Sequence, residues 1–138
     1  MNFENELISG LFVKRYKRFF VDIKLKNKIV TAHCANPGSM MGLLTKNNKV
    51  WLTESLNLKR KLKYTLQIIE DQTSKVGVNT HLTNKIVFDA LQKNLIKDFD
   101  KKIKITSEKV FNSNTRFDFF LEDKKNKYFL EVKNVTLK

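Results

Sequence analysis

The chain has 138 residues, which allows one domain of ordinary size or two small ones. An apolar fraction of 41% with 11 Phe is enough for a packed core, and only 4 Gly and 1 Pro argue against linkers and low-complexity segments. One Cys and two His argue against a disulfide framework and a structural zinc site. No apolar run approaches the ~20 residues of a membrane span, and the N-terminus shows no secretory signal. We therefore expect a cytoplasmic protein with no membrane partner.

Positive charge is concentrated in the first half of the chain. The net charge is +13, and residues 11–65 contain 13 Lys or Arg against only 2 acids, Asp22 and Glu54. A basic surface of this kind suits a polyanion such as nucleic acid. A general lysine bias of the source genome would give the same excess, so charge alone leaves both explanations open.

The first 79 residues predict a series of short strands, at 11–25, 28–35, 49–54, 63–71 and 76–79. Asn36-Pro37-Gly38 marks the main loop, because these residue types favour turns. About five short strands predict a small β-barrel of the oligonucleotide/oligosaccharide-binding (OB) kind. We therefore place a first, OB-like domain at residues 1–79.

Two basic segments in this domain are candidates for binding nucleic acid. In the first, cations alternate with aromatic rings, so that bases would stack on Tyr16 while the cations hold phosphates. The second is a basic loop that would clamp phosphates. The candidate residues are Lys14, Arg15, Lys17 and Arg18 in the first segment and Lys59, Arg60 and Lys61 in the second. A solvated strand with its Phe residues in the core, and a loop that only aids solubility, explain the same patterns equally well.

The pattern changes after residue 79. Thr80 or Thr83 is a candidate N-cap for a helix that runs to about Leu95. Its expected core side consists of Leu82, Ile86, Val87, Ala90, Leu91 and Leu95. Strands are expected at 102–111, 115–121 and 128–135. A helix followed by strands predicts a second domain of mixed α/β type, at residues 80–138.

The last two of these strands form the most informative feature of the chain. A hairpin centred on Lys124-Lys125 places Asp118 opposite Glu131 and collects only apolar or aromatic residues on one face. The other face carries Asp118, Glu131, Lys133 and Arg116 around the pair Phe120 and Phe129. A slip of one residue would mix the two faces, so the apolar pattern selects the register.

Directly opposed carboxylates repel each other, so they require a cation or a proton between them. Oxygen ligands of this kind suit Mg²⁺ or Mn²⁺. Asp118 and Glu131 are therefore candidate metal ligands and, together with Lys133, candidate catalytic residues of a metal-dependent phosphodiesterase. An ordinary amphipathic hairpin with exposed charges has the same local pattern.

Several motifs together resemble the sugar fermentation stimulation protein A (SfsA) family, in family order over essentially the whole chain. They are residues 12–19, 31–40, 42–44, 59–65, 76–80, 116–119 and 131–137. The resemblance implies an N-terminal OB-like domain, a C-terminal domain similar to the PD-(D/E)XK nuclease fold, and DNA binding. It implies that Asp118, Glu131 and Lys133 match the nuclease-like triad, with Asn79 and Arg116 as supporting residues. It also implies further residues after Lys138, so we expect a fragment of a longer protein.

These observations predict a DNA-binding protein with a nuclease-like second domain. Asp118 and Glu131 would ligate the metal, with the backbone carbonyl of Val132 as a further ligand, and Lys133 would stabilise the transition-state charge. The alternative is a non-catalytic DNA-binding regulator of sugar (maltose) metabolism genes that retains the nuclease fold as a scaffold. A third interpretation is an OB module that binds RNA or an oligosaccharide.

Overall fold

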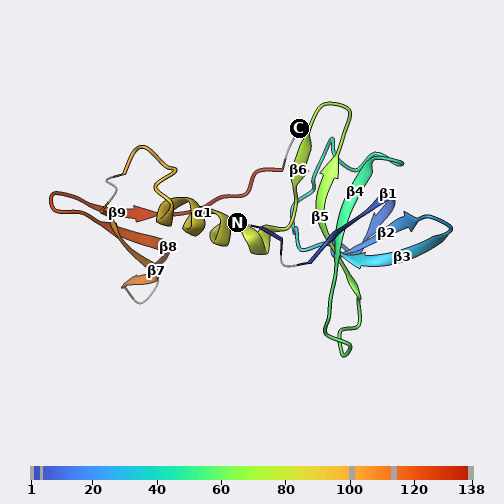
Figure 1. Cartoon of the computed structure of the whole chain (residues 1–138), viewed down its shortest axis with the longest axis horizontal. Coiled ribbons are helices and arrows are strands. Elements are labelled where there is room, and N and C mark those ends of the chain that lie inside the picture. Colours follow the sequence, from blue (N-terminus) through green and yellow to red (C-terminus); the bar gives the residue numbers. More distant parts are fainter. Residues whose placement is uncertain (1, 4, 100–101, 113–114, 137–138) are drawn as a thin grey trace. The chain divides into compact units, whose positions relative to one another are not determined.

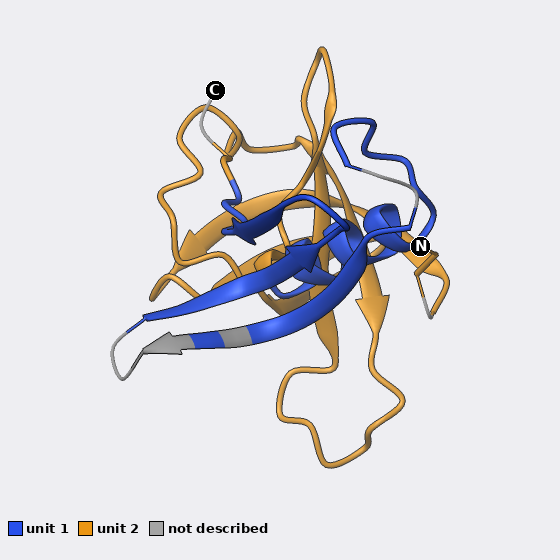
Figure 2. Ribbon diagram, turned by 90° about the vertical axis from the view of Figure 1, so that its left-hand side faces the viewer, with its two compact units in different colours: residues 1, 81–134 blue, residues 2–80, 135–138 orange. Residues whose placement is uncertain are grey.

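The computed structural model describes residues 2–3, 5–99, 102–112 and 115–136. Its described residues divide into two compact units, which Figure 2 distinguishes by colour. One unit consists of residues 2–80 with 135–136, and the other of residues 81–134. None of the described helices is long and apolar enough to cross a membrane.

The first unit is a closed β-barrel (Figure 1). Its strands are β1 (Leu7–Tyr16), β2 (Phe20–Leu25), β3 (Lys28–His33), β4 (Lys49–Glu54), β5 (Tyr64–Glu70) and β6 (Lys75–Gly77). The sheet order is β3-β2-β1-β4-β5-β6, and a parallel pairing of β3 with β5 closes the first five strands into a ring. The predicted OB-like barrel is confirmed.

Alternate residues of β2 and β4 fill the barrel interior, whereas a register shift interrupts the alternation on β5 between Leu66 and Ile69. Ala32 and the larger side chains of Phe12, Val21, Ile23, Val50, Leu52, Leu66 and Ile69 are all buried. Gly10 on β1 lies against the side chains of Ile23 and Leu25 on β2. A Cβ at this position would lie 2.6 Å from Cγ2 of Ile23 and 2.7 Å from Cδ2 of Leu25. The missing side chain therefore allows this close approach.

The prediction of one strand over residues 11–25 is wrong. β1 ends at Tyr16 and β2 begins at Phe20, because the chain turns through Lys17 and Arg18 with φ of 47° and 62°. This left-handed region is disfavoured for residues other than glycine. Two hydrogen bonds stabilise this turn. Nε of Arg15 donates to the carbonyl oxygen of Arg18 at 2.6 Å, and the N–H of Cys34 donates to the carbonyl oxygen of Phe19 at 2.8 Å. Lys17 and Arg18 thus lie in a turn and not on a strand face.

The second unit contains one helix and three strands. A 3-10 turn (Thr80–Leu82) leads into α1 (Thr83–Gln92), which is followed by β7 (Lys104–Asn112), β8 (Thr115–Glu122) and β9 (Lys127–Leu130). The three strands are antiparallel in the order β7-β8-β9. The helix, the expected strands and their order follow the sequence prediction, but α1 ends at Gln92 and not near Leu95, and β9 ends at Leu130 and not near residue 135.

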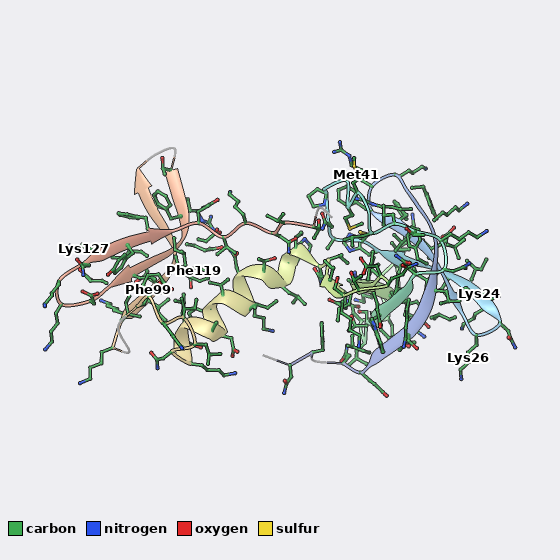
Figure 3. All side chains as sticks on the ribbon, turned by 90° about the horizontal axis from the view of Figure 1, so that it is seen from above. Lys24, Lys26, Met41, Phe99, Phe119 and Lys127 are labelled. Carbon is green, nitrogen blue, oxygen red and sulfur yellow. The ribbon has the colours of Figure 1, made fainter. Side chains whose placement is uncertain are left out.

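A second core lies between α1 and the three-stranded sheet. Leu91, Phe119 and Leu121 are buried there, and Phe99 packs against them (Figure 3). The rings of Phe88 and Phe119 are stacked with centroids 6.1 Å apart. Phe119 and Leu121 belong to the apolar hairpin face that the sequence predicts.

The predicted core side of the helix is wrong in part. Ile86 and Leu95 are 53% and 66% exposed, whereas Phe88, which the prediction omitted, packs in the core. The residue at the N-cap is Leu82, with no side-chain cap, so neither Thr80 nor Thr83 has the predicted role. Oγ1 of Thr80 donates instead to the carbonyl of Ala35 at 2.6 Å.

Candidate functional site

The β8–β9 hairpin has the register that the sequence predicts. Phe119 is paired with Leu130, and Phe120 with Phe129. The turn is held by Asp123, whose Oδ1 accepts hydrogen bonds from the N–H groups of Lys125 and Asn126, both at 2.7 Å. These bonds lower the pKa of Asp123, because they favour its charged form. The hairpin therefore brings Asp118 level with the chain that directly follows β9.

Asp118 connects three parts of the second unit. Its Oδ2 accepts a hydrogen bond from the backbone N–H of Val132 at 2.7 Å, and its Oδ1 accepts one from Nδ2 of Asn84 at 2.8 Å. The half-buried carboxylate thus joins β8, the first turn of α1 and the segment after β9. Because the Val132 N–H is bonded to a side chain, the hairpin continues here through Asp118 after the strand pairing has ended.

Glu131 and Lys133 form an ion pair beside Asp118. Nζ of Lys133 lies 2.6 Å from Oε1 of Glu131. The hydrogen bond and the charge of Glu131 raise the pKa of Lys133, and the charge of Asp118 raises it further. Asp118 acts on Lys133 because its carboxylate is held at the backbone N–H of Val132, the residue before Lys133.

The structure adds residues that the sequence analysis did not assign to the site. Asn84, Ser107 and Glu108 line a shallow depression together with Asp118. Ser107 pairs with Phe119 and Lys109 with Phe117 across β7 and β8, so Glu108 lies opposite Asp118. Glu108 has a φ of 54°, which is left-handed backbone in the middle of a strand. No local pattern predicts this geometry, because it depends on how β7 pairs with β8.

Arg116 forms an ion pair with Glu108. The resemblance to the family implies Arg116 as a supporting residue. Its Nη2 lies 2.5 Å from Oε2 of Glu108, and both side chains are exposed. The site therefore combines carboxylates from β7, β8 and the segment after β9 with the cations Arg116 and Lys133. Within the described ranges, no three side chains of His, Cys, Asp or Glu are arranged to hold a metal ion. A divalent ion here would have Asp118 and Glu131 as side-chain ligands and would need backbone or water oxygens besides.

Arg15 and Asn79 have bonding partners inside the first unit. The guanidinium of Arg15 donates to the carbonyl oxygens of Asn36 and Gly38, both at 2.7 Å. It thereby braces the loop after β3, so its hydrogen-bonding capacity is largely used within the barrel. Nδ2 of Asn79 donates to Oε1 of Gln67 at 2.9 Å.

The remaining predicted basic residues lie on the barrel surface. Lys17 and Arg18 are exposed in the β1–β2 turn, and Lys59, Arg60 and Lys61 are exposed in the loop between β4 and β5. Nζ of Lys14 lies 3.7 Å from Oδ2 of Asp22 and 5.5 Å from the centre of the Tyr16 ring. In OB folds the β1–β2 and β4–β5 loops are those that contact oligonucleotides.

A closed OB barrel followed by a unit of one helix and a three-stranded sheet defines the chain as a two-domain OB-fold protein. Two family models match it: the SfsA N-terminal OB domain at residues 13–78, and the sugar fermentation stimulation protein RE domain at residues 81–138. The chain belongs to the sugar fermentation stimulation protein family, as its motifs predict.

Curated relatives carry the name sugar fermentation stimulation protein homolog. The relative from Pelagibacter ubique (strain HTCC1062) is 53% identical over 137 residues, which are 99% of this chain and 59% of the relative. The relative from Alteromonas mediterranea is 41% identical, covering 99% of this chain and 61% of the relative. The chain thus spans about three fifths of the length of the curated relatives that it matches.

A solved structure has a similar fold. It is described as Pyrococcus furiosus SfsA in complex with Ca²⁺, and it matches with a TM-score of 0.77. The match covers 95% of this chain and 55% of that one at 22% identity, so it supports the fold alone.

Proposed function

We propose that this chain binds DNA through its barrel and carries a divalent-ion-dependent phosphodiesterase site on the β8–β9 hairpin. The observation that carries the proposal is the double hydrogen bonding of Asp118 to Val132 and Asn84, which holds a carboxylate beside Glu131 and Lys133. Two carboxylates can ligate a divalent ion, and an adjacent lysine can stabilise charge on a phosphate. The solved structure of similar fold is described as Pyrococcus furiosus SfsA in complex with Ca²⁺, and we propose a divalent ion as a ligand of this chain too.

Each residue has a distinct task in the proposed mechanism. Asp118 and Glu131 would hold Mg²⁺ or Mn²⁺, which when bound lowers the pKa of water and offsets phosphate charge. Lys133 is protonated at neutral pH like any lysine, and its hydrogen bond to Glu131 raises its pKa further. It can therefore donate to a phosphate oxygen or orient a water molecule. Asn84 positions the Asp118 carboxylate through its amide.

DNA binding rests on the charge and placement of the barrel cations. The exposed residues of the β1–β2 turn and the β4–β5 loop, Lys17, Arg18, Lys59, Arg60 and Lys61, provide five positive groups for phosphates. Affinity for DNA should therefore fall steeply as the salt concentration rises. RNA offers the same phosphates, so competition between the two polymers tests the preference for DNA.

A non-catalytic DNA-binding regulator of sugar metabolism genes is the second candidate. It is favoured by the engagement of Glu131 with Lys133 at 2.6 Å, which leaves that carboxylate neutralised without a metal ion. Cleavage of labelled DNA in Mn²⁺, compared between this chain and its Asp118→Ala and Glu131→Ala variants, separates the two. Cleavage that falls about 100-fold or more in both variants supports the enzyme. Salt-dependent binding with no cleavage at any Mn²⁺ concentration supports the regulator.

A further inference from the structure

Four aromatic rings form a continuous row on the outer surface of the barrel. Tyr16, Phe20 and His33 are direct cross-strand partners on β1, β2 and β3. The Tyr16 and Phe20 rings are stacked with centroids 5.6 Å apart, and Phe19 stacks on His33 at 6.3 Å. We call Tyr16, Phe19, Phe20 and His33 the ring row.

The ring row is on the outside because its neighbours in sequence are on the inside. Val21 and Ala32 are completely buried in the barrel core, so the residues next to them on β2 and β3 point outward. Tyr16 is 37% exposed and Phe19 is 42% exposed. Large exposed aromatic groups gathered in one place are characteristic of a binding surface.

The surroundings of the ring row are polar and basic. The hydroxyl of Tyr16 lies 3.3 Å from Oδ1 of Asp22, and that carboxylate also accepts from Thr31 at 2.9 Å. These contacts fix the orientation of the Tyr16 ring. Lys14 lies over the same ring, and the exposed Lys17 and Arg18 flank Phe19 in the turn. Flat rings with cations beside them fit a ligand that has both aromatic faces and negative charge.

We infer that the ring row is a stacking platform for the unpaired bases of single-stranded nucleic acid. This inference rests on the proposed nucleic-acid binding and adds the form of the strand. Bases in a duplex are already stacked on one another, whereas unpaired bases have free faces for Tyr16 and Phe19. Lys14, Lys17 and Arg18 would hold the phosphates that follow the stacked bases.

The test compares single strands with duplexes of the same length. Fluorescence anisotropy with oligothymidylate of about 12 nucleotides and a matching duplex measures both affinities. The unmodified chain should bind the single strand more tightly, and Tyr16→Leu and Phe19→Leu should each weaken that binding roughly tenfold. Duplex affinity and the salt dependence should stay unchanged, because no charge is altered. An oligouridylate of equal length shows whether the chain distinguishes ribose from deoxyribose. Weaker binding of either single strand by Tyr16→Leu and Phe19→Leu supports the platform.

Two further variants serve as controls. Phe3→Leu changes a similarly exposed ring outside the ring row, at 38% exposure, and should have no effect. Phe19→Tyr keeps a ring and should retain single-strand affinity even if Phe19→Leu perturbs folding. Single-strand binding that is the same in Tyr16→Leu, Phe19→Leu and the unmodified chain would overturn the platform. So would equal binding of duplex and single strand by the unmodified chain, which would leave the proposed DNA binding intact. Binding of neither form would overturn the proposed function as well.

Discussion

The backbone N–H of Val132 donates to Oδ2 of Asp118 at 2.7 Å, so a side chain fastens the segment that carries Glu131 and Lys133. The strand pairing of β9 ends at Leu130, two residues before this bond. Asp118 therefore has two roles in the proposed site. Its charge would attract a metal ion, and its oxygen holds the neighbouring chain in place.

Substitutions of Asp118 separate these two roles. Asp118→Asn keeps an oxygen that accepts from Val132 but removes the charge, whereas Asp118→Ala removes both. We expect both variants to lose divalent-ion binding, and only Asp118→Ala to speed the hydrogen exchange of the Val132 amide, by tenfold or more for loss of a bond worth roughly 1.5 kcal/mol. Metal titration and amide exchange by NMR measure the two effects. Equal protection of Val132 in all three proteins would contradict the fastening role.

Asn84 is expected to position Asp118 for metal binding. Its amide donates to Oδ1 of Asp118 at 2.8 Å, and partners that orient a metal ligand typically change affinity by 10–100-fold when removed. Asn84→Ala should therefore weaken Mn²⁺ binding by about tenfold. Gln92→Ala, at the exposed other end of α1, is the matched control and should leave the affinity unchanged. Isothermal titration calorimetry of both variants decides whether Asn84 has this role.

The pKa of Lys133 reports on the state of Glu131. The hydrogen bond that Lys133 donates to Glu131 raises this pKa above that of an ordinary lysine, so the pair stabilises the folded chain below the ordinary lysine pKa. That contribution is lost as the pH rises through the raised value. In Glu131→Gln, the pKa of Lys133 should fall toward the ordinary value. An NMR titration of the Lys133 side chain measures this shift.

A divalent ion should lower the pKa of Lys133, as the substitution Glu131→Gln is expected to do. Metal binding to Glu131 would compete with its hydrogen bond to Lys133 and add a positive charge nearby. We therefore expect saturating Mg²⁺ to lower the pKa of Lys133 in the unmodified chain and to change it much less in Glu131→Gln. An identical shift in both proteins would mean that the ion does not use this carboxylate.

The sequence was sufficient to predict the barrel, the order of elements in the second unit and the register of the β8–β9 hairpin. Alternation of apolar residues specifies which face of a strand is buried, and therefore the register of Phe119 with Leu130. The turn at Lys17 and Arg18 could not be predicted from the sequence, because neither residue type favours positive φ. That turn depends on the side chain of Arg15 and on the N–H of Cys34, which are contacts made only in the folded barrel.

In the candidate site too, local pairing could be predicted from the sequence, whereas contacts between distant elements could not. Asp118, Glu131 and Lys133 could be chosen from one hairpin, whose pairing is local. Asn84 and Glu108 come from α1 and β7, and their positions depend on the packing of these elements against β8. Helical spacing leaves Asn84 outside the predicted core side of its helix but contains no information about which group it contacts.

A matched pair of glycine substitutions tests how tightly the barrel is packed around β1. In Gly10→Ala the new methyl group would meet Ile23, Leu25 and the carbonyl of Lys24 within 2.9 Å, so backbone or core must shift. We expect a loss of roughly 1–3 kcal/mol in the free energy of unfolding, the range found for overpacked cores. Gly77→Ala places the same group in open space, with nothing within 4 Å, and should change the stability little. Urea denaturation followed by the fluorescence of Trp51 on β4 reports on this unit, because Trp51 is the only Trp in the sequence. Equal midpoints for the two variants would show that β1 can move away from β2 at no cost.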